Sequence, residues 1–329
     1  MTDLRSLPDC PSLRVLVLHR CRDLTSLAGI ERFTQLSVLV VSGAAIQTLA
    51  PITACSGLES VILRDLPALR DVAALSALPR LFQVTMVRAP LSALPPIASL
   101  RALSTSEVSI PSLAPLGHSP GLTHLSIDRL TDTSLRPLQS LSAMRSLSLR
   151  VSGMFVEETL AALPALERVS LSSSELFSLR SLVGKPLRHL APGSHLLRDI
   201  SALGGMTAMR SLDLSRSSWI EDLSPLHALS SLVSLVLPLR RRGLESLECV
   251  GAPGLSSLQR LSVGPQPHLR SLEGLEHLTA LTVLDVVGCR DLRDLRAIHA
   301  LPNLREVRTT WGRATTPRTV QRLARRLTR

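Results

Sequence analysis

Residues 36–52 read LSVLVVSGAAIQTLAPI, and two different apolar periods meet within this stretch. The first half has the alternation of a short strand, with Leu36, Leu39 and Val41 facing inward and Val38 and Val40 facing outward. The second half carries an apolar residue at every third position, which is the period of a 3₁₀ turn or a loose helix. These positions are Ile46, Leu49 and Ile52. The stretch therefore predicts a short strand followed by a helical turn.

The same pattern recurs along almost the whole chain of 329 residues. The template L-x-x-L-x-L-x-x-(N/C) starts at fourteen places about 22 residues apart, with the weakest match at Leu100. The starts are Leu13, Leu36, Leu58, Leu81, Leu100, Leu122, Met144, Leu166, Leu187, Met209, Leu232, Leu258, Leu281 and Leu304. One such unit buries too little apolar surface to offset the entropy of ordering its residues, so the units must stack and fold together.

This periodicity resembles the leucine-rich-repeat family. The segments IEDLSPLHALSSLVSL (220–235) and IQTLAPITACSGLESV (46–61) are similar to the repeats of the internalin-like and SDS22-like subtype. The resemblance implies an α/β repeat solenoid, a curved horseshoe with a parallel β-sheet on its concave side and 3₁₀ or short helical turns on its convex side. The chain departs from the family at the ninth template position, where asparagine is rare. That position holds Cys21, Ala44, Leu66, Ser152, Ser174, Ser217 or Cys289.

The repeats suggest three parts: a partial N-terminal repeat over 1–12, thirteen repeats over 13–303, and a terminal strand with a basic cap helix over 304–329. Leu4 and Leu7 match Leu24 and Leu27 of the next repeat, so the chain opens within a repeat. This favours the C-terminal module of a longer protein, and a mis-assigned start codon would give the same pattern. The segment TTPRTVQRLARRLTR (315–329) has the capping signals and apolar stripe of a helix. It either caps the last coil or contacts a membrane or an acidic partner.

The net charge of +11 has the sign expected for nucleic-acid binding, but its distribution argues against that function. Lys185 is the only lysine, and the arginines are scattered rather than gathered in one basic block. Aromatic residues make up 2 % of the chain and tyrosine is absent, which also argues against a glycan or small-molecule site. Five cysteines without metal-ligand spacing, and no signal peptide or apolar span, predict a cytoplasmic protein without metal or membrane contact.

Motifs of catalysis are absent from the sequence. It contains no G-x-S-x-G, no phosphate loop, no H-E-x-x-H and no G-x-G-x-x-G, and VGKPL around Lys185 matches too little of a phosphate loop. A solenoid also offers an open surface rather than a closed pocket where catalytic groups converge. The sequence therefore predicts no enzyme activity, no cofactor and no small-molecule substrate.

The outward template positions are the third, fifth, seventh and eighth, and they predict a binding face. This face is apolar near the N-terminus and then small and hydroxylated, with an arginine in many repeats. The candidate partner-binding residues are Arg64, Arg88, His124, Arg129, Arg150, Arg168, Asp213, Arg216, Arg260 and Asp285. Arg240, Arg241 and Arg242, in a loop of the longest repeat, are further candidates. The alternative is that all these arginines are solvated and reflect an arginine-rich composition.

Three functions fit this sequence. The leading one is a non-catalytic module that binds a protein partner, with an acidic surface, through the concave face. The second is the sensor or autoinhibitory domain of a larger signalling ATPase that resembles NACHT or NB-ARC proteins. The third is the substrate-recognition part of a ubiquitin-ligase-type enzyme. Charge reversal at Arg150 and Arg168 is expected to weaken partner capture without lowering thermal stability if the leading hypothesis holds.

The motif CRDL occurs twice, at Cys21 and at Cys289, and is a candidate for thiol or metal chemistry. Both cysteines take the ninth template position, where a small thiol can face the turning backbone. The following arginine and aspartate are then expected in an exposed bend. The sequence therefore indicates two copies of one structural position rather than a reactive site.

Overall fold

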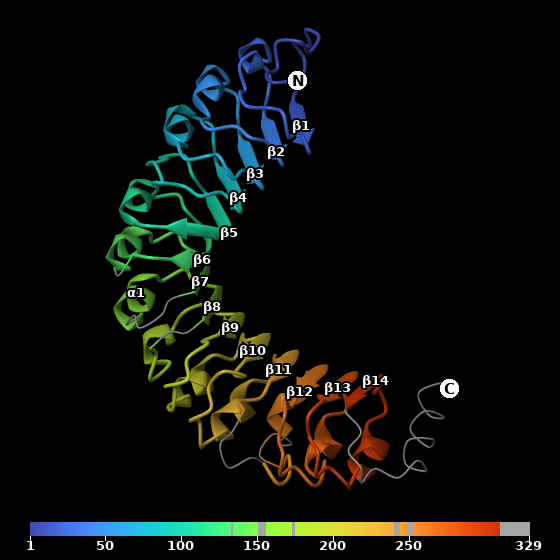
Figure 1. Cartoon of the computed structure of the whole chain (residues 1–329). Helices are drawn as coiled ribbons and strands as arrows, with labels where there is room; N and C mark the ends of the chain where they lie inside the picture. The colour runs from blue at the N-terminus through green and yellow to red at the C-terminus, as the bar shows by residue number, and fades with distance from the viewer. Residues whose placement is uncertain are drawn as a thin grey trace. The chain divides into compact units, whose positions relative to one another are not determined.

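The computed structural model describes residues 1–132, 134–150, 156–172, 175–239, 244–248, 250 and 253–309. The chain forms two compact units, Met1–Leu166 and Glu167–Arg329. In each unit parallel strands lie on the concave side and short helices lie on the other side (Figure 1). The repeat solenoid predicted from the sequence is confirmed. The C-terminal cap helix predicted from segment 315–329 lies outside the described residues, which end at 309.

Among the described residues of unit 1, seven parallel strands pair in chain order. They are β1 (Val15–His19), β2 (Val38–Ser42), β3 (Ser60–Arg64), β4 (Gln83–Val87), β5 (Ala102–Ile110), β6 (His124–Leu130) and β7 (Ser146–Arg150). All of these connections except that between β4 and β5 contain a 3₁₀ helix, and α1 (Glu157–Ala162) follows β7. The 3₁₀ helices are η1 (Ile30–Arg32), η2 (Ala50–Ala54), η3 (Ala73–Ala77), η4 (Ala114–His118) and η5 (Arg136–Ser140). Each strand begins two residues after a template start.

Unit 2 repeats the arrangement, with seven further strands in the part of it that the structure describes. They are β8 (Arg168–Ser172), β9 (His189–Ala191), β10 (Ser211–Asp213), β11 (Ser234–Val236), β12 (Arg260–Ser262), β13 (Val283–Val286) and β14 (Glu306–Thr309). The 3₁₀ helices are η6 (Arg180–Leu182), η7 (Ser201–Gly205), η8 (Ser224–Ala228), η9 (Pro253–Leu255), η10 (Leu275–His277) and η11 (Arg296–Ala300).

The core of each unit lies between its strands and its helices. In the opening stretch, Leu36, Leu39 and Val41 are fully buried, and so are Ile46, Leu49 and Ile52 on the helical side. Strand register places equivalent residues side by side, so Leu16 pairs with Leu39 and Leu39 with Val61. Because each leucine packs against its equivalents in neighbouring repeats, an isolated repeat would leave its core open.

Residues 1–12 are held against the first complete repeat. Leu4 is fully buried, and its backbone N–H donates to the carbonyl of Ala28 at 2.8 Å. The Arg32 guanidinium donates to the carbonyls of Leu4 and Leu7 at 3.0 and 2.9 Å. It also forms an ion pair with Asp9 at 2.6 Å. One arginine of η1 therefore fastens the partial repeat to the solenoid.

Many of the 3₁₀ helices are preceded by a polar residue whose side chain accepts a hydrogen bond from the start of the helix. A serine, threonine or aspartate accepts the backbone N–H two residues further on, at 2.8–3.3 Å. The residues that do this are Thr48, Asp71, Ser112, Ser134, Asp199, Asp222 and Asp294. These side chains satisfy N–H groups that a short helix cannot pair by itself.

The two CRDL cysteines differ in their surroundings. Cys289 is buried, and its thiol donates to the Gly264 carbonyl at 3.2 Å, in the preceding repeat. Cys21 is half-buried, and its thiol contacts the His19 carbonyl of its own repeat at 3.6 Å. Both thiols therefore face a backbone carbonyl as expected, but only Cys289 is buried.

Candidate binding face

The strand face of unit 1 begins with apolar side chains that are open to solvent. Val15 and Val17 of β1 are 53 % and 58 % exposed. Register aligns Val15 with Val38, and it aligns Val17 with Val40 and then with Ile62 of β3. Neighbouring strands lie about 4.8 Å apart, so these five residues form one continuous apolar patch.

Small polar residues form the middle of the same face. An open hollow of about 200 Å³ lies over strands β4–β7. It is lined by side chains of which many are small: Gln83, Val84, Thr85, Ala102, Leu103, Ser104, His124, Leu125, Ser126 and Ser146. The exposed His124 ring lies 2.8 Å from the Thr123 hydroxyl. This part of the face has room for side chains of a partner because its own are short.

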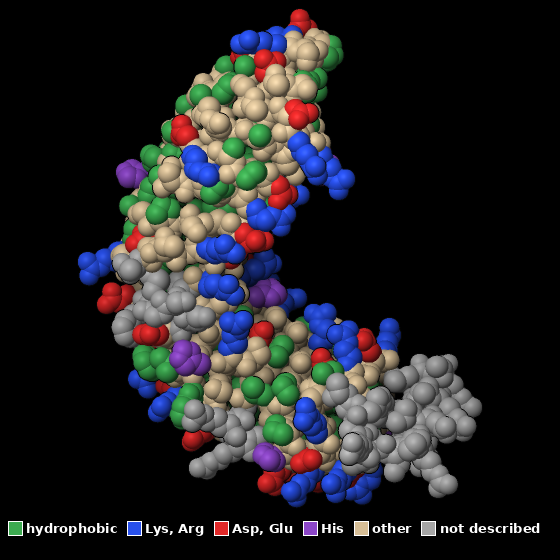
Figure 2. All heavy atoms as spheres, viewed as in Figure 1, with side chains coloured by type: hydrophobic (Ala, Val, Ile, Leu, Met, Phe, Trp, Pro, Cys, Tyr) green, Lys and Arg blue, Asp and Glu red, His purple; other side chains and the backbone are tan. Residues whose placement is uncertain are grey.

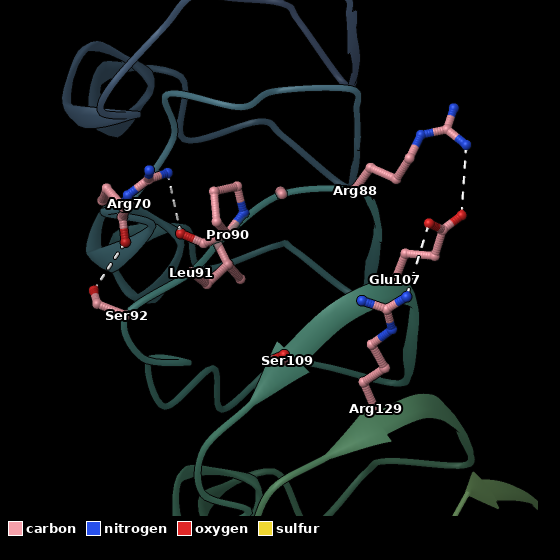
Figure 3. A pocket seen from close by; sticks show the side chains of 9 residues that line it. Arg70, Arg88, Pro90, Leu91, Ser92, Glu107, Ser109 and Arg129 are labelled. Carbon is pink, nitrogen blue, oxygen red and sulfur yellow. Dashed lines mark hydrogen bonds and ion pairs between the residues drawn. The ribbon is translucent and has the colours of Figure 1, made fainter.

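Four charged residues of alternating sign lie along the carboxyl-terminal ends of strands β3–β6. Asp65, Arg88, Glu107 and Arg129 all occupy the eighth template position in successive repeats. Arg88 contacts Asp65 at 2.5 Å. Arg88 also lies 3.5 Å from Glu107, and Arg129 lies 4.0 Å from Glu107 (Figure 3). The hydrogen bond from Arg88 lowers the pKa of the Asp65 carboxyl. We call these four residues the ion-pair row.

A β-bulge positions Glu107 within the ion-pair row. The register between β5 and β6 shifts between Thr105 and Ser109, and Glu107 has a left-handed φ of 55°. Its backbone N–H donates to both carboxylate oxygens of Asp128, at 2.9 and 2.7 Å. Bulges often re-aim a side chain, and here the bulge places the Glu107 carboxylate between two arginines.

A hollow of about 430 Å³ adjoins the ion-pair row (Figure 3). Arg70 lines its other side, and its guanidinium donates to the carbonyls of Pro67 and Pro90 at 2.8 and 3.5 Å. Arg70 therefore holds two turns together. The side chains of Arg88 and Arg129 are partly neutralised by Glu107, so the charge facing this hollow is smaller than its arginine content suggests.

The strand face of unit 2 has arginines at the amino-terminal ends of its strands. Arg168 is the first residue of β8 and pairs in register with His189 of β9, which pairs with Ser211 of β10. Arg188 and Arg210 directly precede His189 and Ser211, and all three arginines are exposed. Partial burial, together with the charges of these arginines, lowers the pKa of His189.

The predicted arginines lie at different levels of the strand faces. Arg64 and Arg150 are exposed at the last positions of β3 and β7, whereas Arg168 and Arg260 are the first residues of β8 and β12. Arg216 is exposed in the turn after β10. Within unit 2 the predicted stripe is therefore not a single line along one level of the face. Across the surface in Figure 2, lysine and arginine side chains are spread out, with acidic side chains beside many of them.

The two predicted aspartates each accept a backbone hydrogen bond within their own turn. Asp213 and Asp285 are half-buried, and their carboxylates accept the backbone N–H of Ser215 and Val287 at 2.9 and 3.0 Å. The predicted loop residues Arg240, Arg241 and Arg242 lie outside the described residues.

Two sets of residues were not among the sequence candidates. Glu107 was missed because its repeat matches the template weakly, although the alternation of sign at the eighth position was a readable signal. Arg188 and Arg210 were missed because they occupy the second position of the repeat template. The alternation of a short strand does not predict that this position faces outward.

The described part of the chain shows no arrangement typical of a metal site. No group of three or more histidine, cysteine, aspartate or glutamate side chains among the described residues is placed to hold a metal ion. Among the same residues, no helix has the length and apolar character that a membrane span requires.

Comparison with solved structures identifies the fold. Internalin inlF of Listeria monocytogenes aligns with 92 % of this chain and 84 % of its own, at 22 % identity and a TM-score of 0.62. A leucine-rich-repeat protein of Leptospira interrogans aligns over 97 % and 95 %, at 16 % identity and a TM-score of 0.70. For InlJ of Listeria monocytogenes the identity is 19 % and the TM-score 0.64, and the alignment spans 91 % of this chain and 64 % of the InlJ chain.

Sequence searches give no such match. No protein-family model matches the chain, and no curated protein matches it. At these identities the structural likeness shows the fold alone, which is that of the leucine-rich repeats.

Proposed function

We propose that this leucine-rich-repeat solenoid is a non-catalytic interaction module that binds a protein partner through its strand faces. The observation that carries the proposal is the strand face of unit 1, where an exposed apolar patch, a trough of small polar residues and the ion-pair row are adjacent. Protein interfaces commonly combine an apolar centre with a polar and charged rim.

The apolar patch is the part of this face that most needs a partner. Valine side chains such as Val15 and Val17 are usually buried, and burying each contributes about 1.5–3 kcal/mol. Exposing several in one place costs solubility, so such patches mark binding surfaces in soluble proteins. The neighbouring hydroxyl groups of Ser104 and Ser126 can hydrogen-bond a partner without blocking its approach.

Similar solved structures include complexes. The plant peptide hormone receptor RGFR1 was solved with RGF2, at a TM-score of 0.52 to this chain. TLR13 was solved with ssRNA13, at a TM-score of 0.57. These complexes support a binding role for this fold. The scarcity of aromatic residues favours a protein partner over single-stranded RNA for this chain, because bases are usually bound by stacking on aromatic rings.

Photo-crosslinking from single positions tests the proposal. A photoreactive amino acid replaces Ser104, which is exposed on the strand face, or Ala77, which is exposed at the end of η3 on the helical side. In cells that naturally produce the protein, Ser104 should give an adduct of defined mass and Ala77 should not. Val17→Asp should reduce the Ser104 adduct at least fivefold, whereas Ala77→Asp should leave it unchanged. Adducts from Ala77 alone, or equal adducts from both positions, would contradict a strand-face site.

A further inference from the structure

Three exposed arginines of unit 2 lie at the amino-terminal ends of the adjacent strands β8, β9 and β10. Arg210 donates its backbone N–H to the carbonyl of Arg188 at 2.8 Å, so these two residues are direct neighbours across β9 and β10. Arg168 is paired in register with His189, the residue that follows Arg188. We call Arg168, Arg188 and Arg210 the arginine cluster, with His189 at its centre.

The arginine cluster lacks the internal neutralisation seen in unit 1. In the described part of the chain, no carboxylate forms an ion pair with any of its three arginines. Glu167 precedes Arg168, and its backbone carbonyl accepts the Arg188 N–H at 2.8 Å. It adds one negative charge beside the arginine cluster, so the four charged side chains carry +2 in total. Like charges on neighbouring strands repel one another, so this grouping costs stability unless an anion binds there. By contrast, Arg88 and Arg129 in unit 1 already contact Asp65 and Glu107.

The surroundings of the arginine cluster indicate which anion fits. The strands β8, β9 and β10 have the sequences RVSLS, HLA and SLD and contain no Phe, Trp or Tyr, and their one ring is the half-buried imidazole of His189. Single-stranded nucleic acids rely on series of stacking platforms, and a single half-buried ring does not form such a series. Guanidinium groups bind carboxylates through paired hydrogen bonds, and Ser170 and Ser211 supply hydroxyl groups on the same face.

We propose that Arg168, Arg188 and Arg210 bind the carboxylates of an acidic segment in the protein partner. This inference rests on the proposed function, because it gives the chemistry of one part of the partner. His189 lies between the arginines, and the neutral form of its ring, which its lowered pKa favours, avoids adding to the repulsion.

Binding of a defined peptide by the purified full chain tests this site. The probe is a fluorescein-labelled twelve-residue peptide in which Glu alternates with Ser, and its Gln counterpart is the neutral control. We expect the double variant Arg188→Glu/Arg210→Glu to bind the acidic peptide at least tenfold more weakly than wild type. Arg188→Gln/Arg210→Gln should also bind the acidic peptide more weakly than wild type, by a smaller factor. This neutral variant tests the site even if the charge reversal impairs folding.

A matched pair of arginines controls for net charge. Arg293 donates its backbone N–H to the Arg270 carbonyl at 3.0 Å, and both side chains are exposed in the segments that lead to the 3₁₀ helices. Arg270→Glu/Arg293→Glu changes the charge equally and should weaken peptide binding less than threefold. Equal weakening in the two double variants would overturn the proposal, because it would show attraction by net charge only.

Two further outcomes separate the alternatives. A twelve-residue oligothymidylate that competes with the acidic peptide at lower concentration than the unlabelled peptide would overturn the proposal in favour of a nucleic-acid site. If the proposed function fails, Ser104 in unit 1 gives no adduct or no more adduct than Ala77. If only the present inference fails, the adduct specific to Ser104 forms, and Arg188→Glu/Arg210→Glu weakens peptide binding no more than Arg270→Glu/Arg293→Glu does.

Discussion

At the scale of single residues, the cysteines show how position in the repeat controls chemistry. Cys55 and Cys289 are buried, and burial raises the pKa of the Cys55 thiol to about 11 and also raises the pKa of Cys289. Cys10 and Cys21 are half-buried. Because the thiolate is the reactive form, the buried pair should be poor nucleophiles in the folded protein.

A thiol-reagent experiment checks this difference. In a Cys249→Ser background at pH 8, two thiols should react quickly with an aromatic disulfide reagent. The other two should react at least tenfold more slowly until urea unfolds the chain. Removing Cys10 and Cys21 by substitution with serine should eliminate the fast phase. A fast phase that persists in that variant would show that Cys55 or Cys289 is accessible.

The charge that each predicted site residue presents depends on ion pairs and hydrogen bonds within the chain. The sequence pattern does not reveal these contacts. Arg88 was correctly expected to be exposed, but its neutralisation by Asp65 and Glu107 depends on contacts between repeats and on a bulge in β5. Asp213 is predicted to face a partner, and the structure adds that its carboxylate accepts an N–H of its own turn. Periodicity gives the face on which a residue lies, whereas its local hydrogen bonds depend on backbone detail that the period does not specify.

At the scale of elements, the polar residue that precedes many of the 3₁₀ helices contributes to stability. Asp222 accepts the Ser224 N–H at 2.8 Å, and hydrogen bonds from the backbone and hydroxyl of Ser224 lower its pKa. Asp222→Ala leaves this N–H at the start of η8 without its acceptor. We expect a loss of about 0.5–1 kcal/mol, at the low end for such caps because the site is exposed.

Urea unfolding at pH 7 measures that loss. Asp222→Asn is the matched control, since the amide oxygen can still accept the Ser224 N–H, and it should retain more than half of the stability that Asp222→Ala loses. The difference between wild type and Asp222→Ala should shrink at low pH. A depressed carboxyl pKa adds stability above the unfolded-state pKa, and this stability is lost as the pH falls through the folded-state pKa. An Asp222→Ala variant as stable as wild type would contradict the capping role.

The positions of the strands were the most predictable feature of the fold. Strands β2 and β3 begin at Val38 and Ser60, two residues after the template starts at Leu36 and Leu58. The strand ends were less predictable. Arg20, Asp65 and Arg88 adopt left-handed φ angles of 51–55° at positions where glycine would be easiest. Hydrogen bonds to the next strand hold this geometry, for example from the Asp65 N–H to the Val87 carbonyl at 2.9 Å.

At the scale of the whole molecule, the solenoid could be predicted because each repeat interacts mainly with its neighbours. A fold built from nearest-neighbour contacts is visible in a local period. The division into Met1–Leu166 and Glu167–Arg329 has no counterpart in that period. The identity of the partner also cannot be predicted from the repeat period, because the repeats determine the shape of a surface and not what binds to it.

The carboxyl groups make the stability of the chain depend on pH in a definite direction. The pKa values of Glu31, Asp65, Asp199, Asp222 and Asp294 are all lowered by hydrogen bonds to backbone or side-chain donors. Below the ordinary carboxyl pKa of about 4, the unfolded chain binds protons that the folded chain resists. The urea midpoint should therefore change little from pH 7 to about pH 5 and should fall as the pH drops further through the folded-state pKa values.

Charge repulsion acts in the same direction and must be separated from this effect. The net charge is already +11 at pH 7, and protonation of carboxylates makes it more positive. Repeating the series in 0.5 M NaCl screens long-range repulsion but leaves hydrogen bonds of about 3 Å largely intact. If the hydrogen-bonded carboxylates dominate, most of the acid-induced fall in the urea midpoint should persist in salt. A fall that disappears in salt would assign the pH dependence to net charge, and a midpoint unchanged at pH 3 would contradict both causes.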